Sequence, residues 1–319
     1  MFKGMEYVYE VYKEKSISKA AKNLYISQPS LSANLKRIEK QIGYPIFDRT
    51  TKPLRLTECG EEYIKAVESI MVIENHFANF VNDWGNLKIG NLIIGGSSLF
   101  ASWVLPPFMA EFTAHYPEVE LTLIEENTQK LQEMLLHGKV DLMLDNCVLD
   151  GEIFEQYKFR EEYLMLAVPA DLAVNEEMKE YQISVEKIRN REFLASDIKD
   201  VPLERFKEEP FVLLKPENDT RKRAMDICKL YHFHPKMIFE LDQQMTSYNL
   251  TCSGMGISFI SDTLISSVPE LPNVIYYKLP KEISCRNLYF YWKKGRYFKR
   301  TMEEFLKLVQ DGKVENPER

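Results

Sequence analysis

The sequence predicts an α/β protein in which an N-terminal winged helix-turn-helix is followed by a long linker helix and a larger α/β body. The first 56 residues contain three segments with apolar residues at helical spacing, followed by a short ribbon-like stretch. One long helical pattern comes next, and from residue 89 onward strand patterns alternate with helical patterns. A chain of 319 residues is also too long for one core, because domains typically run to about 100–200 residues.

The composition is that of an ordinary soluble globular protein, with 45% hydrophobic and 28% charged residues. No segment reaches the roughly 18 uninterrupted apolar residues of a membrane-spanning helix, and no secretory signal is recognisable near the N-terminus. We therefore expect a cytoplasmic protein without a membrane partner. The five cysteines are scattered and form no C-x-x-C pair, so we expect neither a disulfide framework nor a metal site, and no cofactor.

The net charge of −7 conceals an asymmetry along the chain. Residues 1–60 contain 11 Lys and Arg against 6 Asp and Glu, a balance of +5, and the remaining 30 against 42 give −12. A basic module on an acidic body indicates a protein that presents one end to a polyanion. A membrane surface is the other candidate, but no basic amphipathic helix with an aromatic face occurs there.

Local start and stop signals divide the N-terminal segment into three helices. Residues 5–12 have apolar side chains at helical spacing, and Ser16 supplies a start signal for a second short helix. Ser27 is a good N-cap for a third helix, and Pro29 falls in its first turn, where a missing N–H costs nothing. Gly43 can end this helix as a C-terminal cap.

A long helix is expected after the ribbon-like stretch that ends at Leu56, with Thr57 as its cap. Its apolar residues alternate spacings of three and four, as in a helix that pairs with another helix. The residues of this apolar seam are Val67, Ile70, Phe77, Val81 and Trp84. Glu74 on the same seam argues against a long, tight coiled coil, and a helix packed on its own body remains the alternative.

The body shows alternating strand and helix patterns, which favour a mostly parallel sheet. We expect strands near residues 89–95, 120–125, 140–145, 163–168, 192–196, 211–215, 236–241, 256–260, 273–279 and 287–293. The main helices are expected at residues 99–114, 128–137, 219–231, 244–253 and 298–310.

One stretch resembles the DNA-binding domain of LysR-type regulators: SISKAAKNLYISQPSLSANLKRIEKQIGYPIFDRTTKPLRLTECG, from Ser16 to Gly60. It combines the small Ala20-Ala21 pair, the S-Q-P-S-L-S helix start, G-x-P-I-F-x-R and L-T-x-x-G in the expected order. The resemblance continues more loosely in GGSSLFASWVLPPFMAEFTAHYPEVEL, LLHGKVDLML and CSGMGISFI, and so covers essentially the whole chain. Ala33 and Cys59 depart from the family, where a longer polar side chain and alanine are usual.

The resemblance implies a body like a periplasmic binding protein, with two lobes and a cleft between them. The expected domains are a winged helix-turn-helix at 1–58, a linker and dimerisation helix at 59–88, and an effector-binding domain at 89–319. Within the last, lobe I comprises 89–165 and 270–319, and lobe II comprises 166–269. The implied partners are double-stranded DNA with a palindromic operator, a small anionic metabolite and RNA polymerase. The resemblance also implies a dimer or dimer of dimers, in which the seams of two linker helices form an antiparallel pair between two chains.

The third helix is the candidate recognition helix, since its apolar residues leave a polar face to the solvent. Gln and Asn can pair with adenine through two hydrogen bonds, and Ser can meet either kind of base pair. A solvated helix face without a partner is the alternative. The candidate base-edge contacts are Gln28, Pro29, Ser32 and Asn34; Ser30 and Arg37 lie on the same face, Ser27 can contact the DNA backbone, and the wing offers Arg49, Lys52 and Arg55.

A turn in the body points to an anion site. Gly95-Gly96-Ser97-Ser98 follows a strand and precedes a helix, so that backbone N–H groups and a positive helix end face the cleft. Thr128 opens the next strand-to-helix turn and Lys215 ends the strand FVLLK, and the resemblance implies that both face the effector. The alternative is a glycine turn whose serines only cap the helix.

Three classes of function compete. The first is a DNA-binding switch controlled by a small carboxylate or other anion, and the second is a solute-binding protein of the periplasmic type, which has no use for a basic N-terminal module. An α/β enzyme would need a nucleophile with its base, a metal cluster or a cofactor fingerprint, and we expect no catalytic activity. His232-x-His234 lacks a third metal ligand at a useful spacing.

Overall fold

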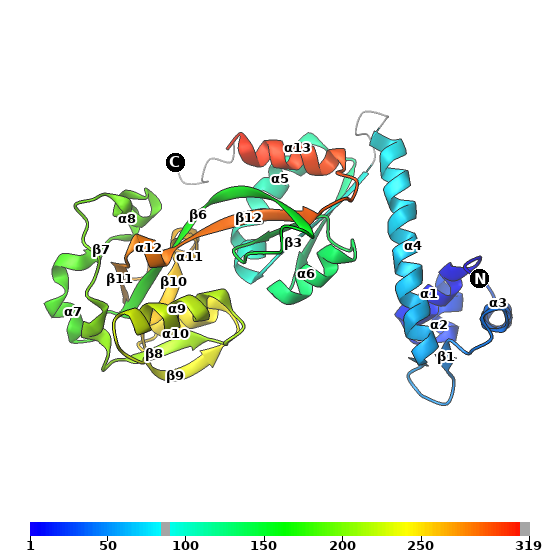
Figure 1. Cartoon of the computed structure of the whole chain (residues 1–319), viewed down its shortest axis with the longest axis horizontal. Helices are drawn as coiled ribbons and strands as arrows, with labels where there is room; N and C mark the ends of the chain where they lie inside the picture. The colour runs from blue at the N-terminus through cyan, green and yellow to red at the C-terminus, as the bar shows by residue number, and fades with distance from the viewer. Residues whose placement is uncertain (84–89, 313–319) are drawn as a thin grey trace. The chain divides into compact units, whose positions relative to one another are not determined.

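A computed structural model describes residues 1–83 and 90–312 of the chain, with the side chains at 75–76 and 78–83 left out. The chain divides into two compact units, Met1–Trp84 and Gly85–Arg319 (Figure 1). The long linker helix, expected as a separate domain from residue 59, therefore belongs to the N-terminal unit.

The N-terminal unit is a winged helix-turn-helix followed by a long helix. Its elements are α1 (Met5–Glu14), α2 (Ile17–Asn23), α3 (Gln28–Ile42), β1 (Phe47–Asp48), β2 (Arg55–Leu56) and α4 (Glu58–Asp83). The predicted caps are confirmed: the Ser27 hydroxyl accepts from the Ser30 N–H at 3.3 Å, and Gly43 ends α3 with φ +91°. The antiparallel pair β1–β2 forms the wing.

The core of this unit includes the first turns of α4. Leu31, Leu35 and Ile38 of α3 pack with Tyr63 and Val67 of α4 in one buried cluster. The Val67 side chain has no exposed surface within its own chain. Its expected place at a seam between two chains is therefore wrong, because the first half of α4 packs on its own unit.

The second unit has two lobes connected by two crossing strands. The first lobe contains β3 (Gly90–Gly96), α5 (Leu105–His115), β4 (Val119–Glu125), α6 (Thr128–Leu136), β5 (Leu142–Asp145) and α13 (Arg300–Gln310), with a π-helical turn Phe100–Val104 before α5. The crossing strands are β6 (Phe154–Pro169) and β12 (Cys285–Lys293). The second lobe contains α7 (Val174–Glu177), β7 (Gln182–Ile183), α8 (Val185–Arg189), β8 (Pro210–Leu214), α9 (Asp219–Leu230), β9 (Lys236–Leu241), α10 (Gln244–Cys252), β10 (Ser258–Ser261), α11 (Asp262–Ser267), β11 (Val274–Lys278) and α12 (Lys281–Ser284).

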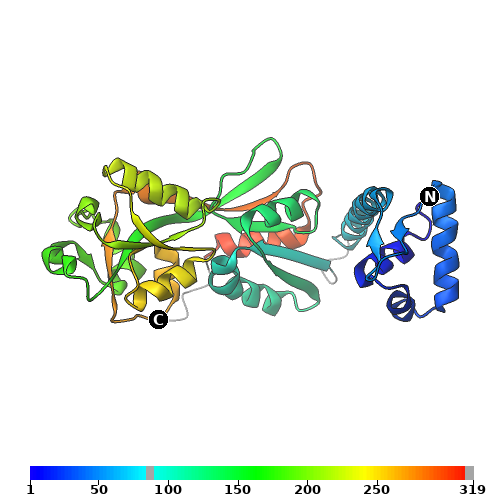
Figure 2. The same ribbon diagram turned by 90° about the horizontal axis from the view of Figure 1, so that it is seen from below.

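Strand β6 spans both lobes (Figures 1 and 2). Its first part, to Tyr163, pairs antiparallel with β12, and its remainder from Leu164 pairs antiparallel with β10 and β11. The sheet runs in the order β4-β3-β5-β12-β6-β11-β7, with parallel pairing of β3 to β4 and β5. The α/β class is thus confirmed, but the sheet is mixed because the two connecting strands run antiparallel to each other.

One predicted strand and one predicted lobe boundary are wrong. The segment expected as a strand at 192–196 is a 3₁₀ turn, Glu192–Leu194, whose Phe193 is buried. The second lobe does not end at residue 269, because β11 pairs with β6 and β7 and its Tyr277 lies in that lobe's core. The second lobe thus continues through α12.

Each lobe has its own buried apolar cluster, centred on residues such as Leu92 and Phe290 in the first and Phe211 and Tyr277 in the second. Every helix in the described ranges is too short or too polar to be a candidate membrane span. The same residues include no group of three or more His, Cys, Asp or Glu side chains that could bind a metal ion.

Candidate DNA-binding surface and effector cleft

The polar face of α3 lies opposite the buried Leu31, Leu35 and Ile38. Two side-chain amides on this face each use one of their two polar atoms in a hydrogen bond: the Ser18 hydroxyl donates to Gln28 Oε1 at 3.1 Å, and Asn34 Nδ2 donates to the Ser30 carbonyl at 3.2 Å. The other polar atoms, Gln28 Nε2 and Asn34 Oδ1, have no partner among the described groups. On this face Ser27, Gln28, Pro29, Ser30 and Arg37 are exposed, whereas Ser32 and Asn34 are half-buried.

The three wing cations differ in their surroundings. Arg49 Nη2 lies 2.7 Å from Glu39 Oε2, so this guanidinium connects the wing to α3. Glu39 Oε1 also accepts from the Ile46 N–H at 3.0 Å. Lys52 and Arg55 are exposed and form no ion pair with another described residue. These two remain available for phosphate contact, whereas Arg49 has a structural partner.

Sequence reasoning missed two exposed side chains near the recognition helix. Tyr25 lies in the turn before α3 with φ +54°, and its side chain is 96% exposed. Lys36 is exposed on α3, one helical turn after Ser32. The Lys36 position follows from helical spacing and could have been found. The exposure of Tyr25 could not, because aromatic residues usually pack inward.

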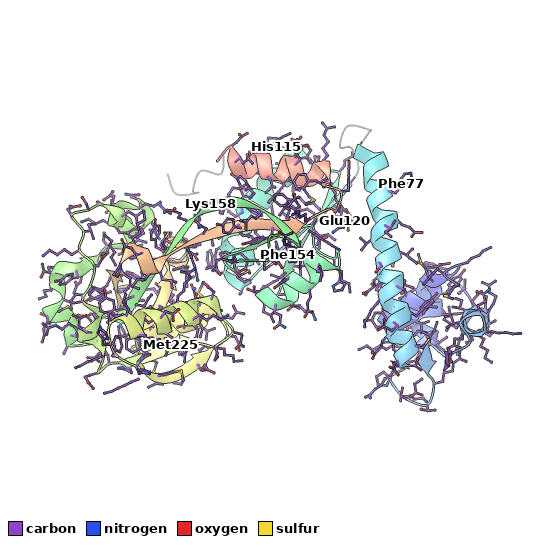
Figure 3. The ribbon with its side chains drawn as sticks, viewed as in Figure 1. Phe77, His115, Glu120, Phe154, Lys158 and Met225 are labelled. Carbon is purple, nitrogen blue, oxygen red and sulfur yellow. The ribbon has the colours of Figure 1, made fainter. Side chains whose placement is uncertain are left out.

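The second half of α4 carries a partly exposed apolar stripe. Ile70 is half-buried, while Ile73 and Phe77 are 66% and 67% exposed. Spacings of three and four place these side chains on one face, and Figure 3 shows Phe77 projecting from the helix. Ile73 was not expected on the seam. The Val81 side chain and Trp84 lie outside the described residues.

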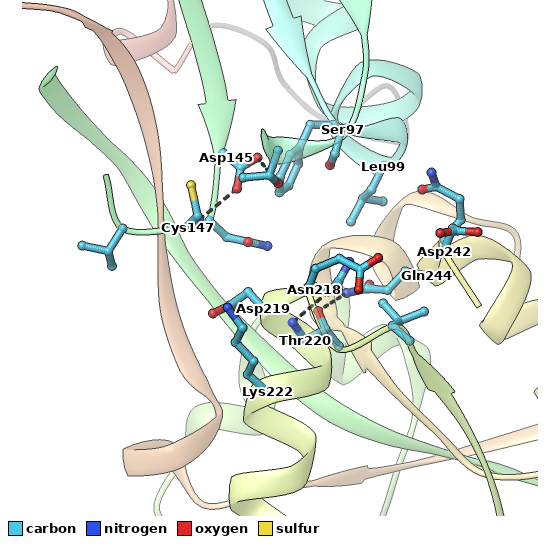
Figure 4. Close-up of a pocket in the computed structure, with 17 residues that line it drawn as sticks. Ser97, Leu99, Asp145, Cys147, Asn218, Asp219, Thr220, Lys222, Asp242 and Gln244 are labelled. Atoms are coloured by element: carbon cyan, nitrogen blue, oxygen red, sulfur yellow. Dashed lines mark hydrogen bonds between the residues drawn. The ribbon is translucent and has the colours of Figure 1, made fainter. Parts of the chain in front are cut away.

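A cleft of about 330 Å³ lies between the two lobes (Figure 4). The first lobe contributes Ser97, Thr128 and Asp145, and the second contributes Asn218, Asp219 and Lys222. A neighbouring hollow of about 640 Å³ shares Thr128 and Asn218 and adds Ser98 and Lys215. The predicted effector residues therefore gather along one continuous groove, with Ser97 and Ser98 in adjoining parts of it.

Helix N-termini from both lobes face this cleft. Asn127 caps α6 by accepting from the Lys130 N–H at 2.9 Å, and Asn218 caps α9 by accepting from the Thr220 N–H at 2.9 Å. A third helix begins directly after Ser97. In the described part of the chain, the Ser97 hydroxyl has no hydrogen-bond partner. Helix starts that line a cleft, together with a free hydroxyl, favour an anionic group.

The two glycines before Ser97 have a packing reason. A Cβ on Gly95 would lie 2.7 Å from Leu131 Cδ2 of α6, and one on Gly96 would lie 3.0 Å from Leu105 Cδ1. A larger residue at either position would force the Leu131 or Leu105 side chain to shift. The glycines thus have a packing role, and the serines are the candidates for ligand contact.

Asp145 lies at the end of β5 in the cleft wall and is only 1% exposed. Its Oδ2 accepts from the Thr128 hydroxyl at 2.9 Å, and its Oδ1 accepts from the Cys147 N–H at 2.9 Å. Burial raises the pKa of the Asp145 carboxyl above its usual value. The Thr128 hydroxyl, expected to contact the effector, donates instead to this carboxylate.

Lys215 does not supply the free positive charge that we expected. Its Nζ lies 2.8 Å from Asp242 Oδ1, and this contact raises the pKa of the Lys215 ammonium. The lining of the two hollows is acidic instead, a property that the sequence did not reveal. It includes six carboxylates, Glu125, Glu126, Asp145, Glu217, Asp219 and Asp242, against two lysines, Lys215 and Lys222.

A buried ion cluster joins the crossing strands to the cleft. Arg286 of β12 donates from Nε to Glu162 Oε2 of β6 at 2.6 Å. Its Nη1 donates to Asp219 Oδ2 and Thr220 Oγ1, both at 3.0 Å and both at the start of α9. Arg286 and Glu162 are 3% and 0% exposed. The helix start that lines the cleft is therefore fixed to the strands that connect the lobes.

A winged helix-turn-helix joined to a two-lobed unit with a ligand-sized cleft defines a DNA-binding regulator with a ligand-binding domain. Residues 2–61 match the family described as "Bacterial regulatory helix-turn-helix protein, lysR family", and residues 85–313 match "LysR substrate binding domain". The chain belongs to the LysR family of transcription regulators. The DNA-binding match disfavours the alternative of a solute-binding protein.

Relatives align over nearly the whole chain. The Bacillus subtilis (strain 168) protein named "Uncharacterized HTH-type transcriptional regulator YcgK" is 28% identical over 313 residues, covering 97% of this chain and 94% of that protein. A "Probable RuBisCO transcriptional regulator" of Gracilaria tenuistipitata var. liui is 26% identical, covering 94% and 92%. The crystal structure of full-length CbnR complexed with its target DNA aligns with a TM-score of 0.67 at 16% identity, covering 98% of this chain and 99% of that chain. At this identity the structural similarity shows the fold alone.

Proposed function

We propose that this regulator binds a palindromic operator as a homodimer or a dimer of dimers, and that a small effector in the cleft between the lobes controls this binding. The main support for this proposal is that side chains from both lobes line one cavity. A ligand that contacts both lobes binds one lobe arrangement better than another, and so shifts the population between them. Such a shift would change operator contacts or DNA bending.

The effector carries an acidic group, in our proposal a carboxylate, at the helix start after Ser97. Two hydroxyls, of Ser97 and Ser98, are free of partners among the described residues, and the starts of α6 and α9 line the same two hollows. Lys222 lines the same cleft and forms no ion pair with a described residue. It replaces Lys215 as the cation available to this group.

Operator reading is expected to depend on Gln28 and phosphate binding on Lys52. Gln28→Ala should reduce discrimination at one base position by about 1–3 kcal/mol, the usual contribution of a paired side-chain contact. Lys52→Ala should weaken binding to all DNA sequences about equally. It should also lower the slope of log affinity against log salt concentration by about one, because one fewer counterion is released. Titrations of selected operator, single-base variants and random DNA at several salt concentrations measure both. Equal losses on operator and random DNA for Gln28→Ala would remove it from the base-reading set.

Assembly is expected to depend on the apolar stripe of α4. Phe77→Asp should convert the protein to monomers, because a carboxylate would be buried at the seam without a partner. Phe77→Leu is the matched control and should keep the dimer, since it keeps the side chain apolar. Light scattering measures the mass of each variant. If Phe77→Asp keeps the mass, fold and DNA affinity of the wild type, the stripe is not the seam.

A further inference from the structure

Asp145 differs from the other deeply buried carboxylates in the described part of the second unit. Glu162 lies 2.6 Å from Arg286, and Asp141 lies 2.7 Å from Lys299. Asp262 has Arg191 at 3.7 Å. Asp145 forms no ion pair with any described residue and has only neutral donors around it: the Thr128 hydroxyl, the Cys147 N–H and thiol, and the Asn146 N–H. It is also the one of these four carboxylates that lines the cleft.

A buried carboxylate without a cation costs free energy, because neutral donors replace only part of its hydration. The raised pKa of Asp145 expresses the same cost. Lys222 faces the same cavity from the other lobe but lies beyond ion-pair distance. A bound molecule or movement of Lys222 could supply a positive charge to this carboxylate.

We propose that the effector is a small amino acid-like zwitterion whose ammonium group binds Asp145, and this inference rests on the proposed function of the cleft. The six carboxylates and two lysines that line the two hollows favour a cationic group and oppose a purely anionic ligand. The helix starts and the Ser97 hydroxyl bind the carboxylate of the same molecule. The part of the groove that Asp145 and Ser97 both line has a volume of about 330 Å³, which has room for a single amino acid.

The ammonium also fits the protonation state of the site. A nearby positive charge favours the ionised carboxylate and reverses the shift caused by burial. Affinity for the amino acid is therefore full above the pKa of Asp145 and falls as the pH drops through it. A ligand without an amine shows no such loss from Asp145, because it needs no ionised carboxylate there.

The test uses the full-length protein and three matched ligand classes: α-amino acids, the corresponding 2-hydroxy acids, and the corresponding primary amines. A thermal-shift screen identifies which amino acid side chain on the ligand stabilises the protein. Calorimetry then gives dissociation constants for that amino acid, its hydroxy acid and its amine. The expected result is an amino acid that binds about tenfold or more tightly than both its hydroxy acid and its amine, the usual difference for a hydrogen bond to a charged group.

Asp145→Asn should remove this preference by lowering amino acid affinity at least about tenfold while leaving hydroxy acid affinity unchanged or higher. The amide can accept from Cys147 N–H and donate to the Thr128 oxygen, so the variant keeps its local contacts. Ser97→Ala should weaken amino acids and hydroxy acids alike but spare the amines. Glu133→Gln, an exposed acid of α6 outside the cleft, is the matched control and should change nothing.

The outcomes separate this inference from the proposed function. Hydroxy acids that bind as tightly as amino acids, or an undiminished preference in Asp145→Asn, would overturn the zwitterion and leave an anion-controlled regulator standing. If Lys222→Met abolishes ligand binding, and the wild type binds amino acids no more tightly than hydroxy acids, then Lys222 and not the ligand supplies the positive charge. If no compound of the three classes binds with a dependence on Ser97 or Asp145, both the inference and the effector cleft are wrong.

Discussion

Replacing Arg286 with methionine is expected to lower the free energy of unfolding of the second unit by about 3–5 kcal/mol, the usual cost of removing one partner of a buried ion pair. The substitution leaves the Glu162 carboxylate at 0% exposure without its cation. It also frees Asp219 and Thr220 at the start of α9. Urea unfolding of the full-length protein measures the loss, and the fluorescence of Trp103 and Trp292 reports on this unit.

Two controls identify the cause. The double variant Arg286→Met with Glu162→Gln should recover much of the loss, because removing both charges leaves no unpaired buried ion. Lys236→Met breaks an exposed ion pair with Glu208 and should stay within about 0.5 kcal/mol of wild type. A double variant as unstable as Arg286→Met alone would show that packing, and not the unpaired charge, dominates at this site.

The elements predicted well are those that local signals define. Ser27 and Gly43 mark the ends of α3 through hydrogen bonds and a backbone angle that involve only a few neighbouring residues. The extent of β6 was underestimated because FEQYKFREEY is rich in charged residues and most of its side chains are exposed or half-buried. A charged, partly exposed strand has no continuous apolar run to reveal it.

The electrostatics of the cleft could not be predicted because they depend on partners distant in the sequence. Lys215 looks like a free cation until the fold brings Asp242 to it, 27 residues away. The pairing of Glu162 with Arg286 joins residues 124 positions apart. Asp145 is a carboxylate that the fold buries without bringing a cation to it, and this is evident only when its neighbours in the folded chain are known. The chemical type of the ligand therefore follows from tertiary structure.

Gly60→Ala is expected to abolish DNA binding by disrupting the N-terminal unit, although it adds only one methyl group. Gly60 ends the L-T-x-x-G motif in the first turn of α4. An added Cβ would lie 2.0 Å from the carbonyl oxygen of Ile46. That oxygen cannot retreat freely, because it accepts from the Thr57 N–H at 3.0 Å. Overpacking against fixed backbone should cost this unit about 3 kcal/mol or more.

The matched control is Cys59→Ala, which changes the adjacent residue of the same helix turn without adding an atom and should lose at most about 1 kcal/mol. Operator titration and thermal unfolding of the full-length proteins measure both variants. Because the second unit has its own cores, Gly60→Ala should keep its ligand response while losing operator affinity. A variant that retains operator affinity would mean that β1 and α4 can separate without cost. The glycine in the motif would then need a reason other than the close approach of helix to wing.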